Sequence, residues 1–265
     1  MSTALVLTPG GHRSQNLVYR VTSGQVLDFF NDRPRIKSLT SEEVIDVPPA
    51  EPDAQRPEFG KGWIAYGAWA NASGSPITDF ETRWKVPAIP SSASGQTIFL
   101  FNGIDPKETG AAILQPVLQW GESAAGGGPY WAVASWYVLG TGHAFHTDLV
   151  RVSPGDDLLG VMKLAGSSNG SFSYSVEFMG IPGTTLAIKN VAELVWCNQT
   201  LEAYQISKCS DYPNVDHTSM NGIRIQIAGR DVEPVWVSNV TATEWLYVVS
   251  CGTRQSHLAR ACANG

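Results

Sequence analysis

The sequence predicts an all-β protein, a sandwich of two packed antiparallel sheets with a jelly-roll arrangement. Its 265 residues include 26 glycines, 16 prolines and nine tryptophans, a composition typical of many short strands joined by tight turns. Apolar or alternating segments recur between turn clusters, at 77–86, 97–104, 112–120, 130–138, 149–164, 172–179, 192–197, 222–228 and 243–251. Eight or nine strands at this spacing predict two sheets packed face to face.

A change of composition near residue 58 divides the chain. Residues 1–57 are predicted to form an N-terminal extension, with plausible strands at 17–23 and 25–30. The proline-rich stretch at 47–58 follows, and closely spaced prolines cannot pair continuously in a sheet, so this stretch is predicted to be a linker. We expect the β-sandwich domain to comprise residues 58–265.

Charge and hydropathy argue against two classes of partner. The net charge is −6 and no cluster of basic residues occurs, so a nucleic-acid backbone has no electrostatic counterpart. No apolar run reaches the roughly 18 to 20 residues of a membrane span, and the N-terminus lacks the pattern of a secretion signal. We therefore expect no nucleic acid and no membrane partner. Localisation stays open between the cytoplasm and secretion with the signal removed.

Cysteine and histidine positions do not indicate a metal. The four cysteines are Cys197, Cys209, Cys251 and Cys262. Pairings 197–209 and 251–262 would each close a short loop, and free buried thiols are the alternative. No C-x-x-C spacing occurs, and His143 and His146 would point to opposite faces of a strand. We expect no metal ion and no cofactor.

Five sequence blocks carry a family resemblance. They are WIAYGAWANASGSPITDFETRWKVP, FNGIDPKETGAAILQPVLQWG, YWAVASWYV, SPGDDLLGVMKL and NVAELVW, in that order. This order resembles the catalytic domain of the fungal-type glutamic peptidases (eqolisins) between about Phe59 and Cys251, and GID followed by AILQ is its most specific part. The resemblance implies a concanavalin A-like sandwich.

The same resemblance implies a catalytic pair, Gln115 in AILQ and Glu193 in AEL. A carboxylate on an apolar strand is a suitable general base for water and afterwards a general acid. A primary amide nearby can donate an N–H to the developing oxyanion. On the residues alone, Gln115 also fits an outward-facing polar position of a strand, and Glu193 fits a solvated strand-edge carboxylate.

Further residues could bind a substrate. The family resemblance implies that Asp105 orients the glutamine or shapes its turn, although an Asp before Pro is also a common turn residue. The tryptophans Trp63, Trp69, Trp84 and Trp136 could wall a groove where a peptide or sugar stacks, with core filling as the alternative. If such a groove exists, at least one of the four should be exposed.

The chain also departs from the family pattern. Val138 stands where AWYEW has its glutamate, Pro106 follows GID, and the second acid of EWIVE falls at or beside Cys197. The surroundings of the pair are therefore expected to be less acidic than in the peptidases.

Two functions follow from this reading. The first is an acid-active glutamic endopeptidase, in which Glu193 activates water and Gln115 stabilises the oxyanion, acting on a polypeptide substrate. The alternative is a non-catalytic, lectin-like protein that binds a glycan or peptide on the same sandwich. The N-terminal extension could be a remnant pro-segment, an added edge strand or a dimerisation arm, and it is long enough to cover a groove.

Overall fold

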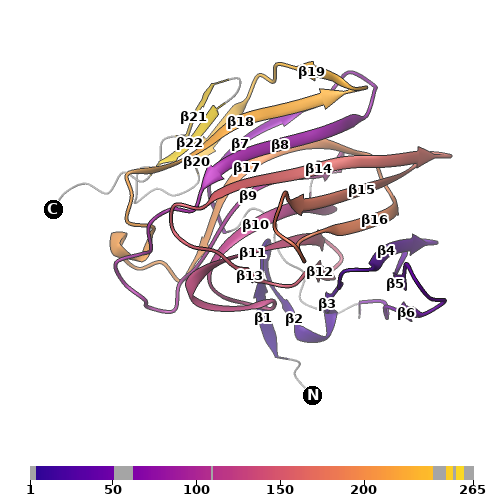
Figure 1. The fold of residues 1–265 in the computed structure, drawn as a ribbon, viewed down its shortest axis with the longest axis horizontal. Coiled ribbons are helices and arrows are strands. Elements are labelled where there is room, and N and C mark those ends of the chain that lie inside the picture. The colour runs from indigo at the N-terminus through magenta and orange to yellow at the C-terminus, as the bar shows by residue number, and fades with distance from the viewer. Residues whose placement is uncertain (1–3, 51–61, 109, 241–248, 253–254, 260–265) are drawn as a thin grey trace.

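The computed structural model describes residues 4–50, 62–108, 110–240, 249–252 and 255–259. Two large sheets pack face to face, which confirms the predicted all-β sandwich (Figure 1). The only helical turns in these residues are the short 3₁₀ segments η1 (Gln15–Leu17) and η2 (Cys209–Asp211). Over the described ranges, no helix has the length and hydropathy needed to cross a bilayer.

The nine-stranded sheet has mostly antiparallel pairs. In hydrogen-bonded order its strands are β20 (Val237–Val240), β7 (Trp63–Ala70), β17 (Leu194–Tyr204), β9 (Thr97–Pro106), β10 (Ala112–Ser123), β11 (Gly126–Leu139), β12 (Ala144–His146) and β3 (Val18–Arg20), with β13 (Val150–Arg151) beside β11. The β12–β3 pair is parallel.

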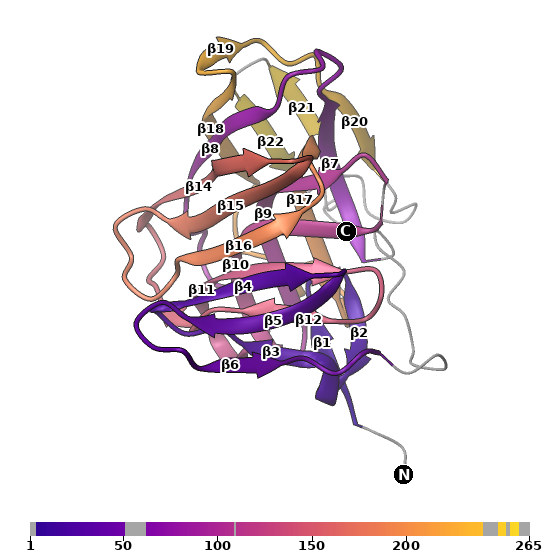
Figure 2. The same ribbon diagram turned by 90° about the vertical axis from the view of Figure 1, so that its right-hand side faces the viewer.

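The eleven-stranded sheet forms the other layer. In order its strands are β21 (Val249–Gly252), β22 (Gln255–Ala259), β18 (His217–Ile227), β8 (Ile77–Lys85), β14 (Asp157–Ser168), β15 (Ser171–Phe178), β16 (Leu186–Val191), β4 (Gln25–Phe30), β5 (Arg33–Ser38) and β6 (Val44–Asp46), with β19 (Arg230–Val232) beside β18. Figure 2 shows β14, β15, β16, β4, β5 and β6 following one another down the molecule. The β16–β4 pair is parallel.

The described part of the N-terminal extension is built into the sandwich. The strands expected at 17–23 and 25–30 are observed as β3 and β4, one in each sheet. The strands β1 (Leu5–Thr8) and β2 (Gly11–Ser14) instead pair only with each other, as a separate hairpin. We call residues 4–14 the arm. Most of the predicted linker, and most of the strand expected at 243–251, lie outside the described residues.

The two sheets are in close contact. Buried side chains from both layers, among them Phe80, Leu114 and Val176, form a common core. At Gly160 of β14, an added Cβ atom would lie 2.6 Å from Asn102 Oδ1 on the opposite sheet. No side chain larger than hydrogen fits between the layers at this point.

The nine-stranded sheet is apolar on its other face as well. Strand β9 is buried along its whole length and β10 along its first ten residues, as expected for strands covered on both sides. On the face turned away from the other sheet, the outer face, one cluster contains Phe99, Phe101, Ile113, Val117, Trp136 and Val138. Leu7 of the arm and Val18 of β3 pack against that cluster.

The arm lies over this outer face and is anchored at several points. Leu7 O accepts a 2.7 Å bond from Ala124 N, beside the turn between β10 and β11. Arg13 Nη1 donates to Leu139 O (3.2 Å), at the opposite end of β11. In a flat hairpin, the turn after β10 and the C-terminal end of β11 would lie roughly 40 Å apart. The two arm residues that bond to these ends, Leu7 and Arg13, are instead neighbours in the arm. The β10–β11 hairpin therefore curves over the arm, and the outer face is concave.

The cysteines correct one expectation. Cys197 is a buried free thiol, whereas Cys209 is disulfide-bonded. The expected pairing of 197 with 209 is therefore wrong. Burial raises the pKa of the Cys197 thiol well above its usual value, so this cysteine is not an activated nucleophile.

Candidate functional site

Gln115 lies on β10, on the outer face of the nine-stranded sheet. Along β10, Leu114 and Leu118 belong to the core between the sheets, whereas Ile113 and Val117 belong to the outer cluster. Because side chains alternate along a strand, Gln115 points outward with Ile113 and Val117. It is paired with Trp136 of β11 and is 0% exposed.

The amide of Gln115 has no hydrogen-bond partner in the part of the chain that the structure describes, on either Nε2 or Oε1. Gln119, four residues further along the same face, is a direct contrast. Its Nε2 donates to Gly121 O and Gly126 O, both at 2.8 Å, and its Oε1 accepts from Ser123 Oγ. Two buried glutamines on one strand thus differ in whether their amides are satisfied.

A second polar group lies beside Gln115, across Gly103 of β9. Leu114 of β10 pairs with Ile104 of the antiparallel strand β9, which places the next residue, Gln115, opposite Gly103. On the other side of β9, Asn198 of β17 pairs with Gly103. Gly103 therefore lies between Gln115 and Asn198. A Cβ atom at Gly103 would lie 2.9 Å from Asn198 Oδ1, which shows that the asparagine amide fills the space above the glycine. Only a glycine at position 103 leaves this room.

Asn198 holds a buried carboxyl group in place. Its Nδ2 donates to Asp105 Oδ1 at 3.0 Å, and its Oδ1 accepts from Thr200 Oγ1 at 3.0 Å. Burial raises the pKa of Asp105 well above its usual value, opposed by the bond from Asn198. Asp105 is a residue of β9 and lies diagonally across from Gln115. The Cα atoms of such diagonal neighbours are roughly 7 to 8 Å apart. The face therefore carries a buried carboxyl group with a raised pKa close to an unpaired amide.

Glu193 occupies the link between β16 and β17 and is half-buried. Its charge acts on Tyr174, a residue of the core between the sheets whose hydroxyl accepts a bond from Leu194 N. Among the contacts of the described residues, none joins Glu193 to Gln115. The residue of β17 that faces Gln115 across Gly103 is Asn198.

The four predicted tryptophans are divided between two faces. Trp63 and Trp136 belong to the outer cluster, and Trp196, which the sequence analysis did not select, stacks on Trp63 with ring centroids 6.2 Å apart. Trp69 and Trp84 pack instead against the core between the sheets. Trp63, Trp84 and Trp136 are at most 6% exposed and Trp69 is half-buried, so none of these four rings is fully exposed for stacking on a sugar.

The two departures from the family pattern have different positions. Val138 lies on the outer face, paired with Ile113, and is fully buried in the apolar cluster. Cys197 faces the core between the sheets. The surroundings of Gln115 are accordingly apolar, with Asp105 as the neighbouring acid.

Opposite charges are buried where the arm meets the sheet. Glu202 of β17 accepts bonds from Gly10 N (2.8 Å) and from the Tyr204 hydroxyl. Burial raises its pKa to about 7, opposed by these bonds and by the charge of Arg13. Arg13 and Glu202 are both 0% exposed. The charge on Glu202 thus depends on pH near neutrality.

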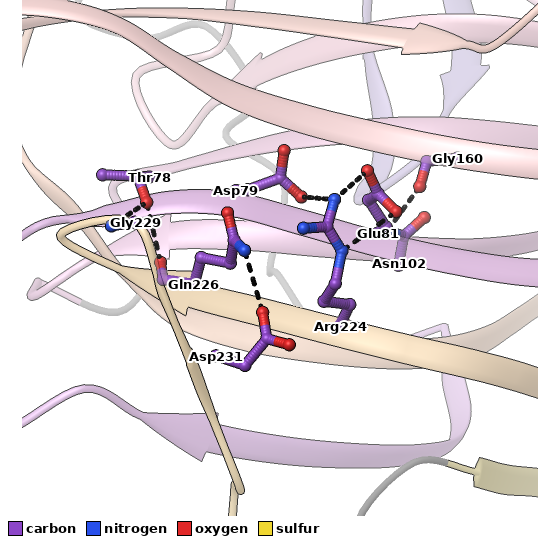
Figure 3. A network of polar contacts seen from close by, with 9 residues as sticks. All are labelled: Thr78, Asp79, Glu81, Asn102, Gly160, Arg224, Gln226, Gly229 and Asp231. Atoms are coloured by element: carbon purple, nitrogen blue, oxygen red, sulfur yellow. Dashed lines mark hydrogen bonds and ion pairs between the residues drawn. The ribbon is translucent and has the colours of Figure 1, made fainter.

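The outer face of the eleven-stranded sheet has a different character. Arg224 of β18 donates to Asp79 Oδ1 (3.2 Å) and to Glu81 Oε1 (2.5 Å), both on β8 (Figure 3). Burial, together with the charge of Glu81, raises the pKa of Asp79 to about 6. Arg224 satisfies both carboxylates beside a register shift between these strands, so we interpret this network as structural.

A cavity of about 740 Å³ lies near one end of β8 and β18. Trp84, Arg83, Lys85, His217 and Asn221 contribute to its lining. Lys85 already pairs with Asp157 at 2.7 Å. Of the predicted site residues, only Trp84 reaches this cavity, so it is separate from the face that carries Gln115.

The histidines considered for a metal point in different directions. His146 packs on Trp136, with ring centroids 4.8 Å apart, and His143 stacks on Phe145. The side chains that the structure describes contain no group of three or more His, Cys, Asp or Glu suited to a metal ion.

Comparisons with known proteins give limited information. No family model matches the chain, and no curated protein matches it. Among solved structures, scytalido-glutamic peptidase with a transition state analog inhibitor aligns at 13% identity and TM-score 0.47, over 76% of this chain and 99% of that one. SCP-B, a member of the eqolisin family of peptidases in complex with the tripeptide Ala-Ile-His, aligns at 14% and 0.49, over 75% and 98%.

A toad ovary galectin in complex with thio-digalactose is also similar, at 9% identity and TM-score 0.31, over 53% of this chain and 98% of that one. All three alignments have TM-scores below 0.5. Similarity at this level carries no argument about the site, which is judged below on its own residues.

The buried Glu202 predicts how stability depends on pH. A carboxyl group whose pKa is raised from 4.5 to about 7 on folding binds its proton more tightly in the folded state. Its contribution is therefore fully present below pH 4.5 and is lost as the pH rises through about 7. The full difference is on the order of 3 kcal/mol. Chemical denaturation at pH 4.5 and pH 8 should show this loss in the wild type and a smaller one in Glu202→Gln. Equal pH dependence of the two proteins would contradict the assignment.

Proposed function

We propose that the protein binds an extended polypeptide segment on the outer face of the nine-stranded sheet, with the Gln115 amide contacting the backbone of the bound segment. The observation that carries this proposal is the buried Gln115 amide, which has no partner among the described residues. A polypeptide is the ligand class because a primary amide offers one acceptor and two donors. These match the donor and acceptor of a peptide unit.

The cost of this arrangement supports a functional reading. A buried polar group without a hydrogen bond costs roughly 1 to 3 kcal/mol, and a methionine or leucine at position 115 would fill similar space without that cost. Gln119 shows that the same strand can satisfy a buried glutamine completely. Unsatisfied buried polar groups in a folded protein call for an explanation, and ligand contact is one that can be tested.

The arm supports the choice of an extended segment. It is itself a pair of short strands, and its Leu7 packs on the outer cluster that includes Ile113 and Val117. Those two residues flank Gln115 on the same face. An extended segment that presents an apolar side chain therefore already packs on this surface.

A second candidate function is hydrolysis of a peptide bond at acidic pH. One observation favours it: Asp105, a buried carboxyl group with a raised pKa, lies on the face of Gln115. Such a group can accept a proton from water and later donate it to the leaving amine. The Gln115 N–H could then stabilise the oxyanion. In the version that the family resemblance implies, Glu193 takes the role of the acid.

Replacing Gln115 by methionine should stabilise the protein and weaken binding. Removing the unsatisfied amide is expected to raise the free energy of unfolding by about 1 to 2 kcal/mol, measured by chemical denaturation. Binding of a reduced and alkylated unfolded protein, followed by calorimetry, should weaken about tenfold, which is the effect of one lost hydrogen bond.

The matched control is Gln119→Met, on the same strand and face. It removes an amide that is fully bonded, so it should lower the free energy of unfolding by about 1 to 3 kcal/mol and leave polypeptide binding intact. If Gln115→Met destabilises the protein as much as Gln119→Met does, Gln115 has a structural partner and the proposal fails.

The hydrolysis candidate is tested by incubating the same unfolded protein with the wild type from about pH 2 to 7 and identifying fragments by mass spectrometry. Under this candidate the wild type cleaves at acidic pH. If Asp105 is the catalytic acid, the Asp105→Asn variant no longer cleaves the substrate. If Glu193 and Gln115 form the catalytic pair, the Glu193→Gln variant no longer cleaves it. Retained cleavage in Gln115→Ala, or no cleavage by the wild type, would exclude this function.

A further inference from the structure

The most deeply buried contact of the arm is made by an arginine. Arg13 is 0% exposed, and its Nη1 donates to three main-chain carbonyls: Leu139 O at 3.2 Å, Gly142 O at 3.1 Å and His143 O at 2.9 Å. Its Nε donates to Thr8 Oγ1 of the same arm, at 2.7 Å. A buried guanidinium is thus held mainly by neutral carbonyl groups of the sandwich.

These carbonyls belong to one tight turn. The turn joins β11 to β12 and is closed by bonds from Leu139 N to His143 O and from Gly142 N to Leu139 O. Gly142 has a φ of +115°, a conformation that residues with a side chain rarely adopt. The turn is closed by its own main-chain bonds and presents three carbonyl acceptors to Arg13.

The arm is anchored to the sandwich by side-chain and single main-chain contacts and not by strand pairing. Its two strands form their own two-stranded sheet and join neither large sheet. Its hydrogen bonds to the sandwich include the one between Leu7 and Ala124, the one from Gly10 to Glu202, and those of Arg13. The His12 ring also packs edge-on against Tyr204 of β17. A segment attached in this way can be exchanged for another without breaking a sheet.

We infer that the outer face contains a site for an arginine side chain, formed by the carbonyls of Leu139, Gly142 and His143, and that Arg13 occupies it as an intramolecular ligand. The inference rests on the proposed function and narrows it: the preferred polypeptide is an extended segment that carries an arginine. The arm then competes with such a segment for the same face.

The chemistry of the site favours arginine over other residues. Several converging carbonyl oxygens suit a planar group with many donors, and guanidinium is more weakly hydrated than ammonium, so it is the cation better suited to burial. Glu202 adds a negative charge at longer range. Burial lowers the pKa of Arg13 to about 10, so the side chain still carries its charge at neutral pH.

The test uses the full chain and a labelled synthetic peptide with the sequence of residues 4–14. In the Arg13→Ala chain the arm lacks its guanidinium, so the peptide should bind at least about tenfold more tightly than to the wild type, by fluorescence anisotropy. A peptide with citrulline at the arginine position should bind the Arg13→Ala chain at least about tenfold more weakly. Arg20→Ala is the control, because Arg20 pairs with Asp148 outside this site and should leave peptide binding at the wild-type level.

The outcomes separate this inference from the proposed function. Equal affinity for the arginine and citrulline peptides would overturn the arginine site while leaving polypeptide binding intact. No binding of either peptide to a folded Arg13→Ala chain would contradict both. If that variant does not fold, hydrogen exchange of the wild-type arm with excess arginine peptide gives the answer: faster exchange at residues 4–14 is expected, and unchanged exchange would overturn the inference.

Discussion

The structure depends on one constraint: the nine-stranded sheet is apolar on both of its faces. The eleven-stranded sheet covers only one of them. Phe99, Phe101 and Trp136 on the other face would otherwise meet water, and each large apolar side chain gains roughly 1.5 to 3 kcal/mol from burial. The curved β10–β11 hairpin and the arm provide the cover. Because the arm joins neither sheet, apolar burial and the contacts of Arg13 hold much of it in place.

The polar groups on this face fall into two kinds. Gln119, Asn198 and Asp105 are hydrogen-bonded and can be understood as structure. Unpaired buried atoms occur on this face and also between the sheets, for example on Asn102 and Gln199, but Gln115 is the one amide of the described chain with both polar atoms unpaired. Buried polar groups that lack a hydrogen-bond partner tend to mark functional sites. The polypeptide proposal follows from the unpaired amide of Gln115, and the arginine site follows from the carbonyl contacts of Arg13.

The sequence was sufficient for the all-β sandwich, because alternation and turn chemistry are local signals. It was not sufficient for the face of each side chain. The strand expected at 192–197 runs as β17 from Leu194 to Tyr204, so the period-two series Asn198, Thr200 and Glu202 was overlooked. Register shifts in β7 and β17 turn Trp63 outward while Trp69 faces inward. The cover provided by the arm depends on long-range contacts, such as Gly10 with Glu202, that no local pattern reveals.

The most direct test of the central claim is the side-chain amide signal of Gln115 in a ¹H–¹⁵N spectrum, assigned by its absence in Gln115→Met. We predict that saturating arginine peptide shifts this signal and slows exchange of its protons, because the amide gains partners from the bound backbone, while the bonded amide of Gln119 changes little. An unchanged Gln115 signal at saturation would contradict the account, since the buried amide would then have no part in binding.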